Sequence, residues 1–166
     1  MIPYLFDTDI LSIFAKAHAL PLLCQLFKSE RLPITPRVFD ELLVPLEYGY
    51  DFPDRIFVLT EVVTVESNEI ETYESLRFEG RVSAADAEII AVCQQRGWTY
   101  AYVSMDQVAL RCAESRRVHT IDLQAILKAL LKGEFLGRDE LAALIEHMER
   151  EDDTTLPYKD ALLKEW

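Results

Sequence analysis

The chain has 166 residues and a mass of 19.1 kDa, the size of one domain that can bury a core without disulfides. Half of the residues are hydrophobic and glycine and proline are sparse, which excludes a disordered chain. The net charge of −12 disfavours tight, nonspecific binding to nucleic acid. A nucleic-acid site would therefore need cations that neutralise its acids, or a local group of bases such as Arg111, Arg116 and Arg117.

The three cysteines, Cys24, Cys93 and Cys112, are an odd number and form no zinc-binding pattern. They are expected to be reduced thiols, with Cys24 and Cys93 packed in the core. Reduced thiols predict a cytoplasmic protein. No stretch approaches the roughly 20 apolar residues of a membrane span, and no leader pattern is present, so neither membrane insertion nor export is expected.

The first part of the chain alternates between strand and helix patterns. Residues 3–6 are an apolar run that predicts a strand, and Thr8 is expected to cap a helix that follows. Helical spacing resumes over 20–27, and residues 32–34 predict a second strand. Thr35 followed by Pro36 predicts the cap and first residue of another helix.

The alternation continues to the end of the chain. Proline, glycine and acids predict a loop over 44–55, and β-branched residues predict a strand over 57–65. Ser83 is expected to cap a helix that ends before Gly97. Further strands are predicted over 100–103 and from 118, and further helices over 67–78, 106–115, 122–131 and 138–150.

Short strands alternating with helices predict a three-layer α/β/α sandwich with a central, mainly parallel sheet. We expect one domain over residues 1–132, followed by a C-terminal helical extension over 133–166 that packs on this domain or trails from it. In such sheets, functional sites lie at the carboxyl ends of the strands.

Acidic residues stand at these strand ends. Asp7 ends the first strand, Asp106 follows the strand over 100–103, and Glu41 lies in the helix after the second strand. Asp86 lies in the first turn of the helix capped by Ser83. Acids at helix starts often serve only as caps, and capping is the better account of Asp86 taken alone. An acid that ends an apolar strand, as Asp7 and Asp106 both do, favours a functional role.

Unpaired carboxylates brought together repel one another, so the predicted cluster implies a cation. Mg²⁺ and Mn²⁺ prefer carboxylate and water oxygen, and no nearby Cys or His suggests zinc. Two such ions about 3.5 to 4 Å apart can support phosphodiester cleavage. Hydrolysis of a phosphodiester bond is the matching chemistry.

Four motifs in this order resemble PIN-domain ribonucleases, including VapC-like toxins, over roughly residues 3–131. The motifs are Leu-Phe-Asp7-Thr8-Asp9, Thr-Pro-Arg-Val-Phe-Asp-Glu41, Ser-Ala-Ala-Asp86-Ala-Glu and Val-Ser104-Met-Asp106.

The resemblance implies an endoribonuclease that cuts single-stranded RNA with Mg²⁺ or Mn²⁺. It implies that the ions are held by Asp7, Glu41, Asp86 and Asp106, with Ser104 assisting. Thr8 and Asp9 occupy variable positions, where Asp9 could support the ligands. The three arginines could contact RNA phosphates, although a solvated helix face explains them equally well. The resemblance to a toxin of this type also implies an antitoxin partner. It further implies that the protein could form a homodimer.

Two other interpretations stay open. Phe6-Asp7-Thr8-Asp9 also looks like the start of a haloacid-dehalogenase-like phosphatase, but that pattern needs Thr or Val where this chain has Leu11. The domain could instead be a catalytically silent interaction module that keeps the fold. Retention of all four acids argues against that reading.

Overall fold

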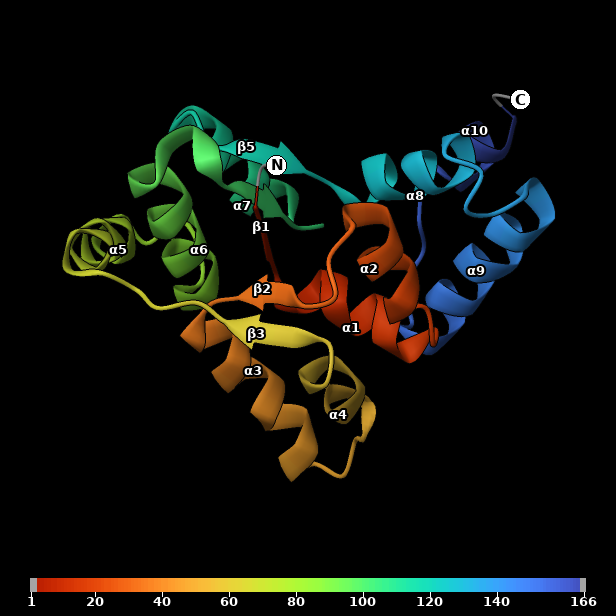
Figure 1. Cartoon of the computed structure of the whole chain (residues 1–166), viewed down its shortest axis with the longest axis horizontal. Helices are drawn as coiled ribbons and strands as arrows, with labels where there is room; N and C mark the ends of the chain where they lie inside the picture. Colours follow the sequence, from red (N-terminus) through yellow and green to blue (C-terminus); the bar gives the residue numbers. More distant parts are fainter. Residues whose placement is uncertain (1–2, 165–166) are drawn as a thin grey trace.

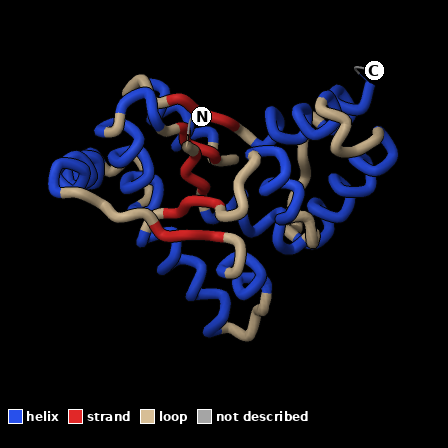
Figure 2. The backbone as a smooth tube through the Cα atoms, in the orientation of Figure 1, coloured by secondary structure: helices blue, strands red, loops and turns tan. Residues whose placement is uncertain are grey.

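The computed structural model describes residues 3–164 and has a parallel sheet at its centre. Two sets of strands are hydrogen-bonded in parallel, with orders β1-β4-β5 and β2-β3. The β2 strand packs beside β1, so the two sets form one layer (Figure 2). The strands are β1 (Tyr4–Phe6), β2 (Leu32–Ile34), β3 (Thr60–Val62), β4 (Ala101–Val103) and β5 (His119–Ile121).

Helices cover both faces of this layer, as the alternation of elements predicts. In Figure 1, α5 and α6 lie on one side of the strands, and α1, α2, α8 and α9 lie on the other. This arrangement confirms the three-layer α/β/α fold. The helices are α1 (Thr8–Lys16), α2 (Leu20–Phe27), α3 (Pro36–Glu47), α4 (Phe52–Phe57), α5 (Ser67–Glu79), α6 (Ala84–Gln95), α7 (Gln107–Ser115), α8 (Leu123–Lys132), α9 (Arg138–Glu151) and α10 (Lys159–Lys164), with a short 3₁₀ turn at Gly97–Thr99.

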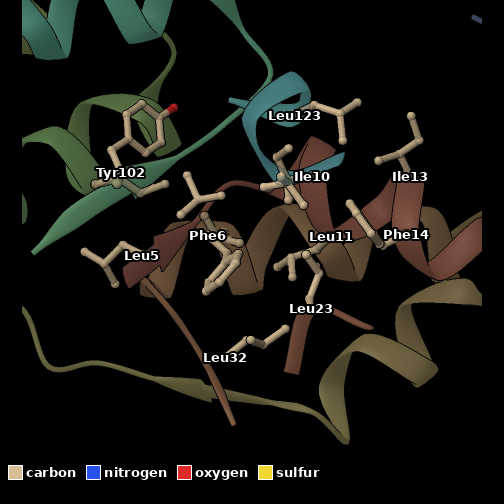
Figure 3. Packing of buried hydrophobic residues seen from close by; sticks show 14 of the residues in the cluster. Leu5, Phe6, Ile10, Leu11, Ile13, Phe14, Leu23, Leu32, Tyr102 and Leu123 are labelled. Carbon is tan, nitrogen blue, oxygen red and sulfur yellow. The ribbon is translucent and has the colours of Figure 1, made fainter. Parts of the chain in front are cut away.

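The core forms where β1 meets α1. Leu5 and Phe6 are fully buried (Figure 3). Because successive side chains of a strand point to opposite faces, these two pack on opposite faces of the sheet. Ile10 and Phe14 of α1 are also fully buried, at a spacing of four that places them on one helix face. Each such side chain contributes about 1.5 to 3 kcal/mol by leaving water. This packing holds β1 and α1 in place on either side of Asp7, the residue that joins them.

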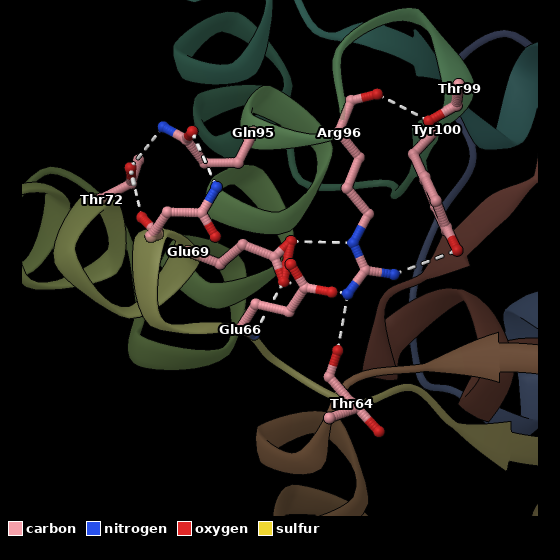
Figure 4. Close-up of polar contacts among 9 residues, drawn as sticks. Thr64, Glu66, Glu69, Thr72, Gln95, Arg96, Thr99 and Tyr100 are labelled. Atoms are coloured by element: carbon pink, nitrogen blue, oxygen red, sulfur yellow. Dashed lines mark hydrogen bonds and ion pairs between the residues drawn. The ribbon is translucent and has the colours of Figure 1, made fainter.

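A buried ion pair ties α5 to α6 on the other side of the sheet. Arg96 donates to both carboxylate oxygens of Glu69 at 2.8 and 2.9 Å, and Glu69 is only 1% exposed. The same guanidinium donates to the carbonyl of Thr64 and to the hydroxyl of Tyr100 (Figure 4). These contacts hold α6, the helix that carries Asp86, against its neighbours.

Three of the local predictions were wrong. The cap of α1 is Asp7 rather than Thr8, because the Asp7 carboxylate accepts the Thr8 N–H. The predicted loop over 44–55 is largely helical: α3 continues past Pro45 into its last turn, and Pro53 lies at the start of α4, where its missing N–H costs nothing. The predicted strand over 57–65 shortens to β3, because α4 extends to Phe57.

The C-terminal helices pack on the rest of the protein. Leu141, Ile145 and Met148 of α9 are buried, and α9 contacts α1 and α8. Lys16 and Asp152 form an ion pair at 2.6 Å that joins the ends of α1 and α9. The boundary predicted at residue 132 stays a prediction.

The cysteines are free thiols in the structure: Cys93 and Cys112 are buried and Cys24 is partly exposed. Within residues 3–164, no helix combines the length and apolar character needed to cross a membrane.

Candidate functional site

Asp7 lies at the carboxyl end of the sheet and joins β1 to α1. Phe6 pairs with Val103, so Asp7 and Ser104 are the next residues on two adjacent parallel strands. The Asp7 side chain is 5% exposed and accepts two hydrogen bonds, from the Thr8 N–H at 2.6 Å and from the Ser104 hydroxyl at 2.9 Å. Its carboxylate is therefore held in place from both neighbouring elements.

The surroundings of Asp7 disfavour its negative charge. Burial raises the pKa of Asp7 well above its ordinary value, and the negative charges of Asp86 and Asp9 raise it further, while the bonds from Ser104 and Thr8 oppose this. Within residues 3–164, no Lys or Arg side chain forms an ion pair with Asp7. A bound cation would relieve the cost of this charge.

Glu41 approaches the site from the first half of α3. Its carboxylate accepts a short hydrogen bond from the Thr8 hydroxyl, which links α3 to the start of α1. Partial burial raises the pKa of Glu41, and the charges of Asp86 and Asp9 raise it further, while the bond from Thr8 lowers it. Thr8 donates to both carboxylates, through its N–H to Asp7 and through its hydroxyl to Glu41, which places Glu41 near Asp7.

Asp86 enters from the first turn of α6 and is 6% exposed. Its two carboxylate oxygens accept from different side chains, one from the Ser83 hydroxyl at 2.8 Å and the other from the Tyr102 hydroxyl in a short bond. Tyr102 belongs to β4 and is fully buried. Burial and the charges of Asp7 and Asp86 raise the pKa of its phenol far above the ordinary value, so it stays a donor.

Asp106, like Asp9 and Glu41, is an exposed member of the cluster. Its carboxylate caps α7 by accepting the backbone N–H groups of Val108 and Ala109 at 2.9 and 3.1 Å, and its own N–H donates to the Ser104 hydroxyl at 3.1 Å. Asp9 lies among the acids: burial raises its pKa first, followed by the charges of Asp86, Asp152 and Asp106. All four predicted acids, together with Asp9, therefore lie around one end of the sheet.

The acids do not form a closed metal cage. Within the described residues, no three Asp, Glu, His or Cys side chains converge closely enough to hold one ion. Three of these carboxylates bind other groups of the protein: Glu41 accepts from Thr8, Asp86 from Ser83 and Asp106 from the first turn of α7. The chemistry of the donors still fits Mg²⁺ or Mn²⁺, because all are carboxylate oxygens and Asp7 is buried with no Lys or Arg partner among residues 3–164.

Several residues that support the site were missed when the sequence was considered alone. Tyr102 looks like strand core, yet its hydroxyl binds Asp86. Glu88, 8% exposed, accepts the Arg37 N–H at 2.9 Å and so fixes the start of α3, the helix that carries Glu41. The signal for Glu88 was a charged residue on an otherwise buried helix face.

Asp122 is a further acid at a strand end. Val103 pairs with Ile121, so Asp122 is the next residue on the strand beside Ser104. Its carboxylate accepts the Ala125 N–H at 2.8 Å and caps α8. Its position after a short strand is the same signal that identified Asp7.

Arg111 lies midway along α7, and Arg116 and Arg117 follow the end of α7 that is farther from Asp106. Arg116 forms an ion pair with Glu79 at 2.6 Å and donates to Gln94, so it joins α7 to α5 and α6. At a rise of about 1.5 Å per residue, it lies roughly 15 Å along the helix from Asp106. Arg111 and Arg117 are exposed. A contact between these residues and RNA stays a prediction.

The chain matches a model of a known protein family. A family model described as PIN domain matches residues 3–158, which includes the strands, the acids and the chain through α9. No curated protein matches the chain.

Proposed function

The chain belongs to the PIN-domain family, and on that premise we propose that it is a metal-dependent endoribonuclease that hydrolyses phosphodiester bonds of single-stranded RNA. Proteins of this family are commonly nucleases, which supports a hydrolase. RNA as the substrate is proposed from the resemblance of the four motifs.

One observation carries the proposal. Asp7 is a buried carboxylate at the end of a parallel strand, its charge is opposed by Asp86 and Asp9, and no basic side chain of the described residues pairs with it. A carboxylate in this state costs folding free energy unless a cation joins it. Retention of such a group favours a role in binding a cation.

The roles of the residues follow from their positions. Asp7, Glu41, Asp86 and Asp106 would hold the cation, directly or through water. Ser104 orients the Asp7 carboxylate, and Thr8 orients that of Glu41. When bound, Mg²⁺ or Mn²⁺ supplies Lewis acidity, which activates water and offsets the charge of the phosphate. The exposed acids of the cluster, Asp9, Glu41 and Asp106, mark the side from which an RNA phosphate would approach.

The test is a calorimetric titration with Mn²⁺ or Mg²⁺, followed by cleavage of end-labelled single-stranded RNA in the same preparations. We expect wild type to bind the ion and to cut RNA, and Asp7→Asn to lose both. Asp54→Asn changes an exposed acid of α4 in the same way and should behave as wild type. An active Asp7→Asn protein would refute the assignment. A single-stranded DNA of the same sequence shows whether the sugar is discriminated.

A second candidate function is favoured by the absence of a closed metal cage within residues 3–164. In this alternative, the domain is a catalytically silent interaction module, and its acids serve only as helix caps and hydrogen-bond acceptors. Absence of ion binding by the wild type in calorimetry would make this the better account.

The biological role that we propose is the toxin of a toxin–antitoxin pair in the cytoplasm. An antitoxin could neutralise the protein by placing a basic side chain against Asp7 or Asp106, because a charge-assisted hydrogen bond to a carboxylate is strong. Growth arrest on expression of the wild type but not of Asp7→Asn would support this role. Analytical ultracentrifugation would test the homodimer that the family resemblance implies.

A further inference from the structure

A cavity of about 430 Å³ lies beside Asp106, at the carboxyl ends of β4 and β5. Met105 and Gln107, the two neighbours of Asp106 in sequence, line one side of it, and Asp122 lines another. Cavities that bind small organic ligands usually have volumes of about 300 to 1,000 Å³. The cavity is therefore large enough for one nucleoside and lies next to the candidate cleavage site.

The C-terminal segment forms one wall of the cavity. Thr155 and Tyr158 line it from the connection between α9 and α10. This connection is firmly held: the carboxylate of Glu149 accepts the Leu156 N–H at 2.8 Å and pairs with Lys159 at 2.8 Å, and Leu156 is 3% exposed. The wall is thus a fixed part of the fold.

The lining suits a base better than a phosphate. Met105, Leu123 and Tyr158 offer apolar and aromatic surface. Gln107 and Gln124 offer side-chain amides that make no hydrogen bond within residues 3–164. Among the described residues that line the cavity there is no Lys or Arg, so none of them offers a cation to a phosphate, and Asp122 would repel one.

A larger hollow of about 740 Å³ lies elsewhere, near the ends of α1 and α9, but its lining differs in charge. Asp51, Glu151, Asp152 and Asp153 line it, against Lys16 and Arg55 as its fixed positive charges. Its excess of acids would repel an RNA strand. The smaller cavity is the better place for part of an RNA substrate.

We propose that the cavity between Met105, Asp122 and Tyr158 is a nucleobase subsite, which binds the base of a nucleotide next to the scissile phosphate of the RNA strand. Single-stranded RNA is usually recognised in this way, by stacking of an unpaired base and hydrogen bonds to its edge. Gln107 and Gln124 read the edge of the base, and the C-terminal segment serves substrate recognition. The inference rests on the proposed ribonuclease function, since it names the part of the RNA that the site selects.

The first test is a titration of the protein with each of the four neutral nucleosides in EDTA. Binding is monitored by NMR, from the side-chain amide signals of Gln107 and Gln124. Neutral nucleosides avoid repulsion by the acids, and EDTA separates binding from cleavage. We expect saturable shifts with at least one nucleoside. Thr155→Trp, which adds a large side chain to the wall of the cavity, and Gln124→Leu, which removes an amide, should each weaken binding at least fivefold. Ser75→Trp and Gln25→Leu introduce the same side chains at positions outside the cavity and should have no effect.

The second test is cleavage of a randomised RNA with Mn²⁺, with sequencing of the cut ends. We expect a base preference at one position beside the cut, which falls at least fivefold in Thr155→Trp and Gln124→Leu while cleavage continues. Wild-type cleavage without base preference, together with no nucleoside binding, would overturn the subsite and leave the ribonuclease intact. Nucleoside binding without any cleavage would uphold the cavity as a base site and refute the ribonuclease.

Discussion

The Ser104 hydroxyl donates a hydrogen bond to the Asp7 carboxylate at 2.9 Å, across 97 positions of sequence. The same oxygen accepts the Asp106 N–H at 3.1 Å. One fully buried hydroxyl therefore connects two candidate ligand residues that follow different strands. Its removal should affect both the fold and the site.

Ser104→Ala should lower the free energy of unfolding by about 1 to 2 kcal/mol, because a buried carboxylate loses a donor and the Asp106 N–H loses its acceptor. Cleavage should fall about 10- to 100-fold, the usual effect of removing a group that orients a metal ligand. Urea denaturation and RNA cleavage rates measure the two effects. Ser75→Ala, an exposed change on α5, should alter neither. Full activity of Ser104→Ala would remove Ser104 from the site.

Tyr102→Phe should lower the affinity for Mn²⁺ by about tenfold, because Asp86 loses the hydroxyl that orients it. The loss of one hydrogen bond should also cost about 1 kcal/mol of stability. Tyr100→Phe is the matched control: its hydroxyl accepts from Arg96 instead, so stability should fall slightly while ion affinity is kept. Calorimetric titration with Mn²⁺ measures the affinity of both variants. Equal affinities of Tyr102→Phe and Tyr100→Phe would show that Tyr102 has only a structural role.

Much of the candidate site could be predicted because strand ends and parallel order are local signals. The alternation of strands and helices predicted the layers, and an acid after an apolar strand identified Asp7 and Asp106. The orientation of the carboxylates could not be predicted, because it depends on partners distant in sequence: Thr8 bonds Glu41 and Tyr102 bonds Asp86.

Predictions from local residue types were wrong where tertiary packing determines the structure. Pro45 predicted the end of a helix, but α3 buries Val38 and Leu42 against the core and continues to Glu47. The cavity beside Asp106 could not be predicted either, because one of its walls comes from residues near 155, which approach β4 only in the folded chain.

Arg96→Gln should lower the free energy of unfolding by about 3 kcal/mol, because it leaves the Glu69 carboxylate, 1% exposed, without its cation. The double variant Glu69→Gln/Arg96→Gln removes the buried charge as well, so it should be more stable than Arg96→Gln alone. Chemical denaturation of the wild type, both single variants and the double variant gives the coupling between the two residues. A double variant as unstable as the sum of the single ones would show that they act independently.

Asp7→Asn should make the metal-free protein more stable at neutral pH, although it abolishes cleavage. Burial and the charges of Asp86 and Asp9 raise the pKa of Asp7 in the folded state, so the folded protein takes up a proton that the unfolded chain releases. The free energy of unfolding in EDTA should therefore rise as the pH falls through the raised pKa. Below the pKa that the Asp7 carboxyl has in the unfolded chain, Asp7 is protonated in both states, so the ionisation of Asp7 no longer changes the free energy of unfolding with pH.

Thermal melts of wild type and Asp7→Asn between pH 4 and pH 8 measure this effect, where pH 4 is about the ordinary pKa of an aspartate. The melting temperature of Asp7→Asn in EDTA should exceed that of the wild type by a few degrees at pH 8, and the difference should shrink toward pH 4. Addition of Mn²⁺ should raise the melting temperature of the wild type alone, because an ion that binds only the folded state stabilises it. Asp54→Asn should follow the wild type throughout. If Asp7→Asn melts below the wild type at pH 8 in EDTA, the Asp7 charge stabilises the fold without metal, and the argument that this carboxylate requires a cation fails.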